Sequence, residues 1–154
     1  MPVETLKKFL DDRKVRYVSI KHSLAYTAQE IASSAHIQGK DIAKTVIVKI
    51  DDRMAMAVLP AHLKIDLNRF SEALGGRKVT LAEEHEFSER FPGCAPGAMP
   101  PFGNLYDMEV YVDPALSEDE DIAFNAGSHT ELIRLRYKDF ARLVTPRVIS
   151  LAEA

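Results

Sequence analysis

KTVIVKIDDRMAMAVL, residues 44–59, is the stretch that decides the fold. Its first half, residues 44–50, is rich in β-branched side chains, and its second half, residues 54–59, is apolar throughout. The polar residues Asp51, Asp52 and Arg53 between the two halves are typical of a turn. The stretch therefore predicts a β-hairpin, although the absence of glycine leaves the turn type open.

Helices and further strands are predicted on both sides of this hairpin. Before it, the pattern predicts a short amphipathic helix around residues 6–10, a strand over 17–20, and a helix from the capping-box spacing at Thr27 to about residue 35. After it, the predicted order is a helix capped by Asp66 and stopped by Gly75-Gly76, a strand over 79–81, a helix over 83–90, a strand over 109–112, an acidic solvated loop over 117–121, strands over 122–125 and 130–135, and a helix over 138–143. Helices interleaved with hairpins, without strict βαβ units, predict an α+β fold with a mixed or antiparallel sheet.

Length and composition favour one globular domain over residues 1–154. The net charge of −3 argues against sequence-independent binding to duplex DNA, although contact with one or two phosphates stays open. No apolar run is long enough to span a membrane, and no signal peptide is recognisable. The single cysteine, Cys94, suits a reducing compartment, so we expect a cytoplasmic protein.

The common catalytic signatures are missing from the sequence. The five histidines, at positions 22, 36, 62, 85 and 129, do not have the spacing of a metal site, so neither a metal nor another cofactor is predicted. Serine-hydrolase, P-loop and dinucleotide motifs are absent. Cys94 has no identifiable histidine partner, which favours a small loop residue over a nucleophile.

The segment from Pro92 to Gly103 contains seven glycines and prolines in twelve residues, which indicates a loop of defined shape. Within it, Gly97-Ala98-Met99-Pro100-Pro101 can present the amides of Ala98 and Met99 to a carbonyl oxygen that gains negative charge. A purely structural loop covering the end of a sheet explains the same composition equally well. The sequence pattern does not separate these two interpretations.

Two further polar positions have similar alternatives. Lys44 begins the first strand of the hairpin, where it either ends the strand at the surface or reaches a cleft, in which its ammonium group would suit a phosphate or ribose oxygen. Ser128 and His129 follow Gly127 at the start of a predicted strand, so their side chains should point to opposite faces and cannot form a catalytic pair. One of them lines a pocket, or both serve the turn.

Four segments together resemble the YbaK/prolyl-tRNA synthetase-associated editing domain: residues 22–32, 42–46, 97–103 and 124–129. The resemblance extends from about residue 15 to residue 146. It implies a compact domain with a mixed, barrel-like β-sheet flanked by helices. Because no synthetase domain accompanies it in the sequence, we expect a free-standing member of the family. The resemblance also implies hydrolysis of the ester between a wrongly attached amino acid and the 3′-terminal adenosine of tRNA.

The resemblance also implies roles for individual residues. The backbone of Gly97, Ala98 and Met99 would hold the aminoacyl carbonyl, and Lys44 would hold the terminal phosphate or ribose. The remaining candidates for substrate binding are Tyr26, Thr45, Pro100, Pro101, Phe102, Gly103, Gly127, Ser128 and His129. Attack assisted by the ribose 2′-OH or by the substrate itself would need no protein nucleophile.

Three functional hypotheses follow from the sequence. The first is a trans-editing aminoacyl-tRNA deacylase, in which Lys44 and the Gly97–Pro101 segment share one cleft. The second is a non-catalytic module of the same fold that binds tRNA or a translation factor. The third is an unrelated hydrolase with Cys94 as nucleophile. For a tRNA-binding protein with a net charge of −3, either the basic residues cluster in the fold or a partner, such as a synthetase, holds the tRNA. The amino acid removed is not predictable.

Overall fold

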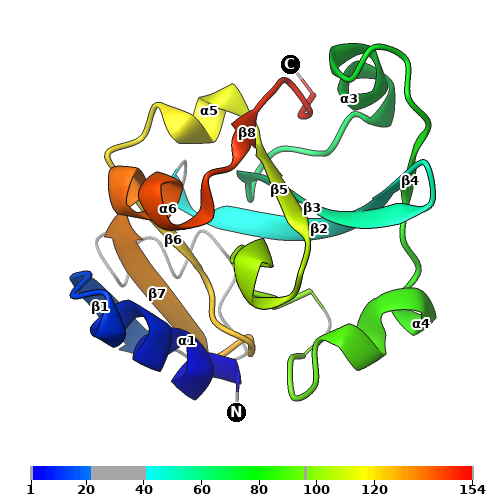
Figure 1. Ribbon diagram of the computed structural model, residues 1–154. Coiled ribbons are helices and arrows are strands. Elements are labelled where there is room, and N and C mark those ends of the chain that lie inside the picture. The colour runs from blue at the N-terminus through cyan, green and yellow to red at the C-terminus, as the bar shows by residue number, and fades with distance from the viewer. Residues whose placement is uncertain (1, 22–40, 96, 154) are drawn as a thin grey trace.

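The computed structural model of the chain describes residues 2–21, 41–95 and 97–153 (Figure 1). The helix predicted over 27–35 lies outside these residues. The described helices are α1 Pro2–Asp12, α3 Leu67–Ala73, α4 Glu84–Phe87, α5 Pro114–Ser117 and α6 Tyr137–Val144, with short 3-10 turns η2 Ser88–Arg90 and η3 Gly103–Leu105. The described strands are β1 Tyr17–Lys21, β2 Ala43–Ile50, β3 Arg53–Pro60, β4 Val79–Leu81, β5 Glu109–Val112, β6 Asp121–Asn125, β7 Glu131–Arg136 and β8 Arg147–Val148.

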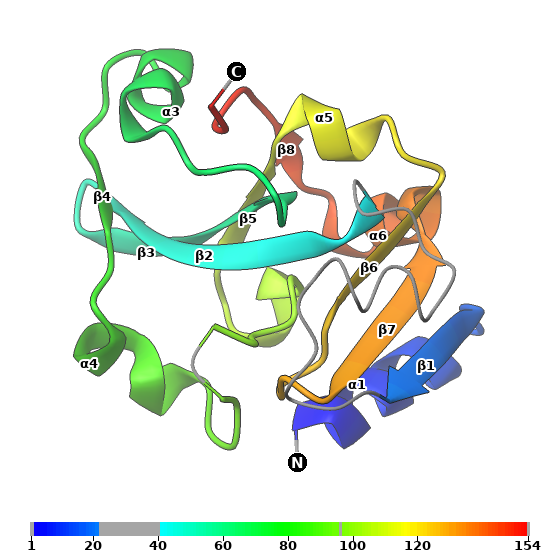
Figure 2. The same ribbon diagram turned by 180° about the vertical axis from the view of Figure 1, so that it is seen from behind.

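The strands form two sheets, which meet near the start of β2 (Figure 2). The larger sheet has the order β4-β2-β3-β5-β8 and is mixed, because β3, β5 and β8 run parallel while β2 is antiparallel to both of its neighbours. The smaller sheet, β1-β7-β6, is antiparallel. A parallel bridge between Ile42 and Ala123 connects the two. The predicted α+β class with a mixed sheet is confirmed.

The β2–β3 hairpin has the register that the sequence pattern predicts, from Ala43 opposite Pro60 to Ile50 opposite Arg53. Its two turn residues, Asp51 and Asp52, have φ values of 49° and 72°. Two consecutive positive φ values are the pattern of a type I′ turn, for which aspartate is among the preferred residues after glycine and asparagine. The Asp51 carboxylate accepts hydrogen bonds from Arg77 Nε at 2.8 Å and from the Lys78 amide at 3.2 Å, which stabilises the turn without glycine.

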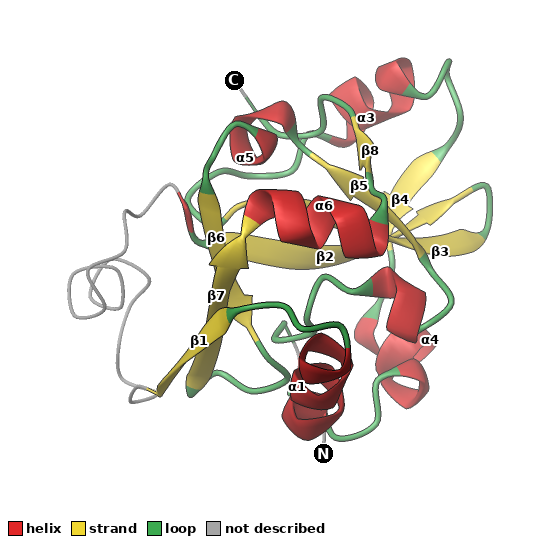
Figure 3. Ribbon diagram, turned by 60° about the vertical axis from the view of Figure 1, so that its left-hand side comes forward, coloured by secondary structure: helices red, strands yellow, loops and turns green. Residues whose placement is uncertain are grey.

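Two hydrophobic clusters lie on the two faces of the larger sheet. Side chains of β2 point alternately into the two clusters: Ala43 and Ile47 pack in the first, and Val48 and Ile50 pack in the second. Helices α1 and α6 cover the first cluster, and α3 packs on the second through Phe70 (Figure 3). Because both faces of the larger sheet are covered, we expect a functional site in the loops at the ends of the strands.

Asp113 connects the carboxyl end of the chain to the sheet. Its carboxylate caps α5 through the Ala115 amide and also accepts the amides of Leu151 and Ala152, each at 3.0 Å. Neither α5 nor β8 was expected from the sequence. The predicted acidic solvated loop over 117–121 is wrong, because Ser117 ends α5, Asp121 begins β6 and Asp119 between them is buried. The helix predicted over 83–90 is divided into α4 and η2.

Candidate active site

The Gly/Pro-rich segment is attached to the turn between β6 and β7 by two backbone hydrogen bonds. The Ala95 amide donates to the Gly127 carbonyl oxygen, and the Gly127 amide donates to the Ala98 carbonyl oxygen, each at 2.8 Å. We call this pair of hydrogen bonds, which joins Ala95 and Ala98 to Gly127, the clamp. Gly97 lies within it and has a φ of +78°, in the region that favours glycine. A methyl group on Gly97 would lie 3.7 Å from His129 Cε1, so the imidazole is its nearest side chain. The structure therefore brings together Gly97, Ala98, Gly127 and His129.

The backbone amides of Ala98 and Met99, both predicted to donate to a substrate oxygen, differ in whether they already have an acceptor in the protein. The Ala98 amide donates to the Ala95 carbonyl oxygen at 3.0 Å, so the expectation that it is free for a substrate is wrong. The reason is local, because the segment closes a turn on itself before it reaches Met99. Within the described residues, the Met99 amide has no hydrogen-bond acceptor. Like the Gly97 amide, the Met99 amide is left without an acceptor among the described residues, and its role as an oxyanion donor stays a prediction.

The second half of the segment is an anchor. Pro100 and Pro101 are buried and carry no N–H, and Phe102 lies wholly in the first cluster, with its ring centre 5.5 Å from those of Phe124 and Phe140. A methyl group on Gly103 would lie 2.3 Å from the Met108 carbonyl oxygen, so only glycine fits there. In this structure Phe102 and Gly103 fix the position of the segment, and the Phe102 side chain does not face solvent.

Lys44 lies in β2 opposite Leu59 and is half-buried. Burial lowers the pKa of its ammonium group, and the nearby charge of Lys64 lowers that pKa further. No carboxylate of the described residues pairs with Lys44. Thr45, the next residue, is buried and points to the opposite face of the strand. Among the described residues, the Lys44 ammonium group therefore has no ion-pair partner, while Thr45 faces the side of the first cluster.

The parallel bridge between Ile42 and Ala123 relates the position of Lys44 to that of Gly127 in the clamp. From the Ile42–Ala123 bridge, β2 and β6 leave in the same direction, because the bridge is parallel. Lys44 lies two residues beyond it, and Gly127 lies four residues beyond it, a span of at most ~13 Å along a strand. Neither Lys44 nor Gly97 lines the cavity beside Cys94 or the cavity between the β2–β3 turn and η3. That the two share one cleft remains a prediction.

The remaining predicted site residues are Ser128, His129 and Tyr26. Ser128 Oγ lies 3.1 Å from Thr130 Oγ1, which is turn chemistry, and β7 begins only at Glu131, so Ser128 and His129 lie in a turn and not in a strand. His129 is exposed beside Gly97. Tyr26 lies outside the described residues. Lys64 was not predicted from the sequence, although the hairpin register places the residues after Leu59 next to the start of β2.

Cys94 does not have the surroundings of a nucleophile. Burial raises the pKa of its thiol, and Tyr106 is its hydrogen-bond partner, with Sγ and the phenol oxygen 4.0 Å apart. A raised pKa lowers the thiolate fraction at neutral pH. Cys94 instead lines a cavity of about 200 Å³ with Phe87, Phe91 and Met99.

The sequence matches the model of one protein family, the aminoacyl-tRNA editing domain, over residues 22–143. That match covers most of the chain and every predicted site residue. The chain belongs to the aminoacyl-tRNA editing domain family. This confirms the family resemblance found in the sequence.

Named relatives of this editing domain act on tRNA. The chain is 32% identical over 126 residues to the multifunctional Ser/Thr-tRNA deacylase ProXp-y of Escherichia coli K12, covering 79% of this chain and 73% of that protein. It is 27% identical over 142 residues to the prolyl-tRNA editing protein ProX of Acetoanaerobium sticklandii, covering 88% and 85%. A solved structure described as a candidate trans-editing enzyme for prolyl-tRNA synthetase shares the fold, with a TM-score of 0.83, 21% identity, and coverage of 99% and 98%.

The described part of this editing domain has neither a candidate membrane-spanning helix nor a candidate metal-binding cluster. Over residues 2–21, 41–95 and 97–153, no helix has the length and apolar character needed to cross a membrane. Across the same residues, no cluster of three or more histidine, cysteine or acidic side chains could hold a metal ion.

Proposed function

We propose that this editing domain is a trans-acting deacylase that hydrolyses the ester of a mischarged amino acid on tRNA. The observation that carries the proposal is the clamped Gly97 segment, whose Met99 amide has no partner among the described residues, in a chain of the editing family. The relatives named for Ser/Thr-tRNA and prolyl-tRNA editing support the same reaction class.

In the reaction, a water oxygen attacks the ester carbonyl carbon and the carbonyl oxygen becomes an oxyanion. The bond from carbon to the ribose 3′ oxygen then breaks, and this oxygen takes up the proton lost by the attacking water, which releases the amino acid and the tRNA 3′-OH. The Met99 amide donates to the oxyanion, and one such donor is worth about 2.7–4 kcal/mol in the transition state. The two bonds to Gly127 hold that amide in place before the substrate arrives, so little reorganisation is needed.

Lys44 and Lys64 supply the anion-binding part of the site. Their mutual repulsion and the burial of Lys44 both disfavour the charged ammonium group of Lys44. A phosphate between the two lysines reverses this effect, because each ammonium then has an opposite charge. The terminal phosphate of the tRNA is a suitable anion, and its binding orients the ester toward the Met99 amide.

No side chain is assigned as a nucleophile. The pKa of Cys94 is raised by burial, which disfavours attack by a thiolate. The substrate's ribose 2′-OH is adjacent to the ester and orients the attacking water. Discrimination between amino acids then depends on pocket shape, and one methylene is worth about 1–3 kcal/mol.

The test is a deacylation panel with purified protein. The esters are alanine and cysteine on tRNA for proline, together with serine and threonine on non-cognate tRNAs. We expect one ester to disappear with the wild-type protein and to persist with Lys44→Ala, whose fold is verified by circular dichroism. Binding of tRNA without cleavage of any ester would instead support the non-catalytic module.

A further inference from the structure

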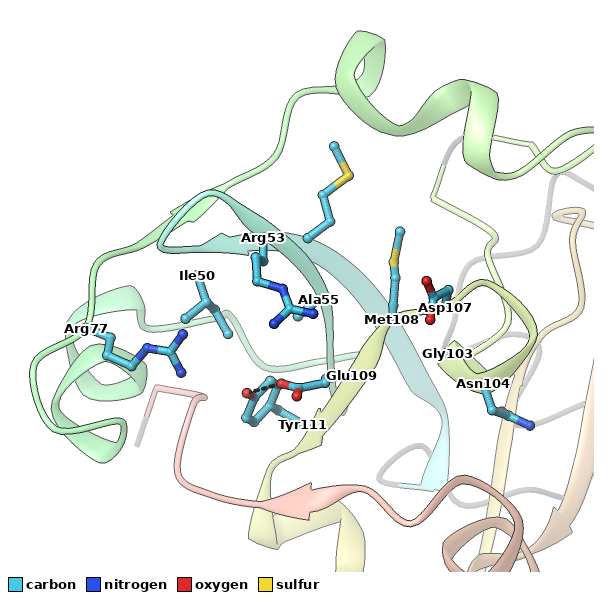
Figure 4. A pocket seen from close by; sticks show the side chains of 11 residues that line it. Ile50, Arg53, Ala55, Arg77, Gly103, Asn104, Asp107, Met108, Glu109 and Tyr111 are labelled. Carbon is cyan, nitrogen blue, oxygen red and sulfur yellow. Dashed lines mark hydrogen bonds between the residues drawn. The ribbon is translucent and has the colours of Figure 1, made fainter.

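A polar cavity of about 410 Å³ lies at the edge of the larger sheet, between the β2–β3 turn and η3 (Figure 4). The reason for the cavity is the stagger of the strands. β5 begins opposite Ala55, so Arg53 and Met54 at the start of β3 have no neighbouring strand on that side. The cavity is separate from Lys44 and from the Gly97 clamp, and it touches the Gly/Pro-rich segment only at Gly103.

Two guanidinium groups, of Arg53 and Arg77, and two carboxylates, of Asp107 and Glu109, line this space (Figure 4). Arg53 is exposed and has no acidic partner among the described residues. Arg77 binds Asp51 only through Nε, which leaves its two terminal nitrogens for a ligand. Across from them, the Glu109 carboxylate accepts a hydrogen bond from the Tyr111 hydroxyl at 2.8 Å, which fixes its orientation.

These groups suit a nucleotide better than a simple anion. Guanidinium groups bind phosphate oxygens through paired hydrogen bonds. A fixed carboxylate accepts hydrogen bonds from ribose hydroxyls, whereas it would repel an isolated phosphate. Ile50, Met54 and Met108 add an apolar wall that suits the face of a base. The volume lies in the range of small-ligand sites.

We propose that this cavity binds one ribonucleotide of the tRNA substrate, with the phosphate on Arg53 and Arg77 and the ribose on Glu109. The proposal rests on the proposed function for the identity of the RNA. Gly103 at the cavity lies six positions after Gly97 in the clamp, a span of at most ~20 Å, so one tRNA end reaches both.

Methionine methyl groups provide a direct test. Met54 and Met108 line the cavity, while Met99 lies in the clamped segment. In protein labelled with ¹³C at the methionine methyls, titration with cytidine 5′-monophosphate should shift the Met54 and Met108 signals and leave Met99 unchanged. Inorganic phosphate, and the nucleotide lacking both ribose hydroxyls, should bind at least about fivefold more weakly because each lacks the contact to Glu109. Shifts at Met99 alone, or equal binding of inorganic phosphate, would overturn the proposal.

Arg53→Gln is the matched variant, because Arg53 has no partner in the described fold whose loss would disturb it. We expect it to abolish the nucleotide-induced shifts, to raise KM for a mischarged tRNA about tenfold with kcat unchanged, and to reduce the salt slope of tRNA binding by about one. Arg16→Gln, at an exposed arginine before β1, is the control and should leave the shifts, KM and the salt slope as in the wild type.

The two proposals fail separately. Cleavage by the wild-type protein with an unchanged KM in Arg53→Gln overturns the cavity proposal and leaves the deacylase intact. Shifts at Met54 and Met108 without cleavage of any ester support the nucleotide cavity and overturn the deacylase.

Discussion

The Gly127 amide donates a hydrogen bond to the Ala98 carbonyl oxygen at 2.8 Å, across 29 residues of sequence. Together with the reciprocal bond from Ala95 to Gly127, it joins the Gly/Pro-rich segment to the turn after β6. The buried prolines and Phe102 hold the other end of the segment in the core. The Met99 amide between these anchors is therefore held in one position, as a preorganised oxyanion donor requires.

Gly97→Ala should impair catalysis without unfolding the protein. The new methyl group has room, since its nearest contact would be 3.7 Å, but a φ of +78° strains alanine by about 1 kcal/mol. We expect kcat to fall at least about tenfold, because a small shift of the clamp displaces the Met99 amide. Gly75→Ala is the matched control, with a φ of +75° and open space around it. If both variants lose the same stability and only Gly97→Ala loses activity, the role of the clamp is supported. An unchanged kcat in Gly97→Ala contradicts it.

Gly103→Ala should destabilise the protein far more than Gly97→Ala does. Its methyl group would lie 2.3 Å from the Met108 carbonyl oxygen and 2.6 Å from Val110 Cγ2, so backbone must move. We expect the free energy of unfolding to fall by about 3 kcal/mol or more in urea denaturation. Gly76→Ala, at a φ of +92° with no atom within 4 Å, should cost only about 1 kcal/mol. Similar losses for both variants would contradict the packing described for Gly103.

Lys64→Gln should move the pH dependence of substrate binding. The pKa of Lys44 is lowered first by burial and second by the charge of Lys64. Phosphate binding needs the Lys44 cation, so affinity falls as pH rises through that pKa. Removing Lys64 removes one of the two causes, so the pKa of Lys44 rises and the alkaline limb of kcat/KM moves to higher pH. A weaker affinity with an unmoved alkaline limb would contradict the coupling, and Lys138→Gln, an exposed lysine on α6, serves as control.

Cys94→Ala should retain full deacylase activity. Burial raises the pKa of the thiol, and its hydrogen-bond partner is the Tyr106 hydroxyl and not a base. The variant removes only one sulfur from a half-buried position, so we expect a stability loss of about 1 kcal/mol. Loss of activity at full folding, or rapid inactivation of the wild type by iodoacetamide, would favour the cysteine hydrolase.

Local pattern was sufficient to predict most of the fold. The β-branched run in residues 44–50 predicted the central hairpin, and Asp66 followed by Gly75-Gly76 predicted the bounds of α3. The elements that were missed depend on distant partners. β8 has two residues and exists because β5 offers it an edge, and α5 is a single turn capped by Asp113, which also binds the carboxyl end of the chain.

The candidate site was predictable in composition and less so in detail. The Gly/Pro density and the family resemblance identified the segment around Gly97, but the pairing of the Ala98 amide with Ala95 is a turn geometry that residue types do not determine. Lys64 carries no local signal, since it becomes a neighbour of Lys44 only through the hairpin. The cavity at Arg53 and Arg77 also depends on strand stagger, which the sequence does not encode locally.

The most direct test of the deacylase is the fate of the ester in the panel of mischarged tRNAs. The wild-type protein should release one amino acid class catalytically, with many turnovers per protein molecule, and Gly97→Ala and Lys44→Ala of equal stability should each be at least about tenfold slower. Persistence of every ester alongside measurable tRNA binding, or cleavage that is indifferent to both substitutions, would contradict the account.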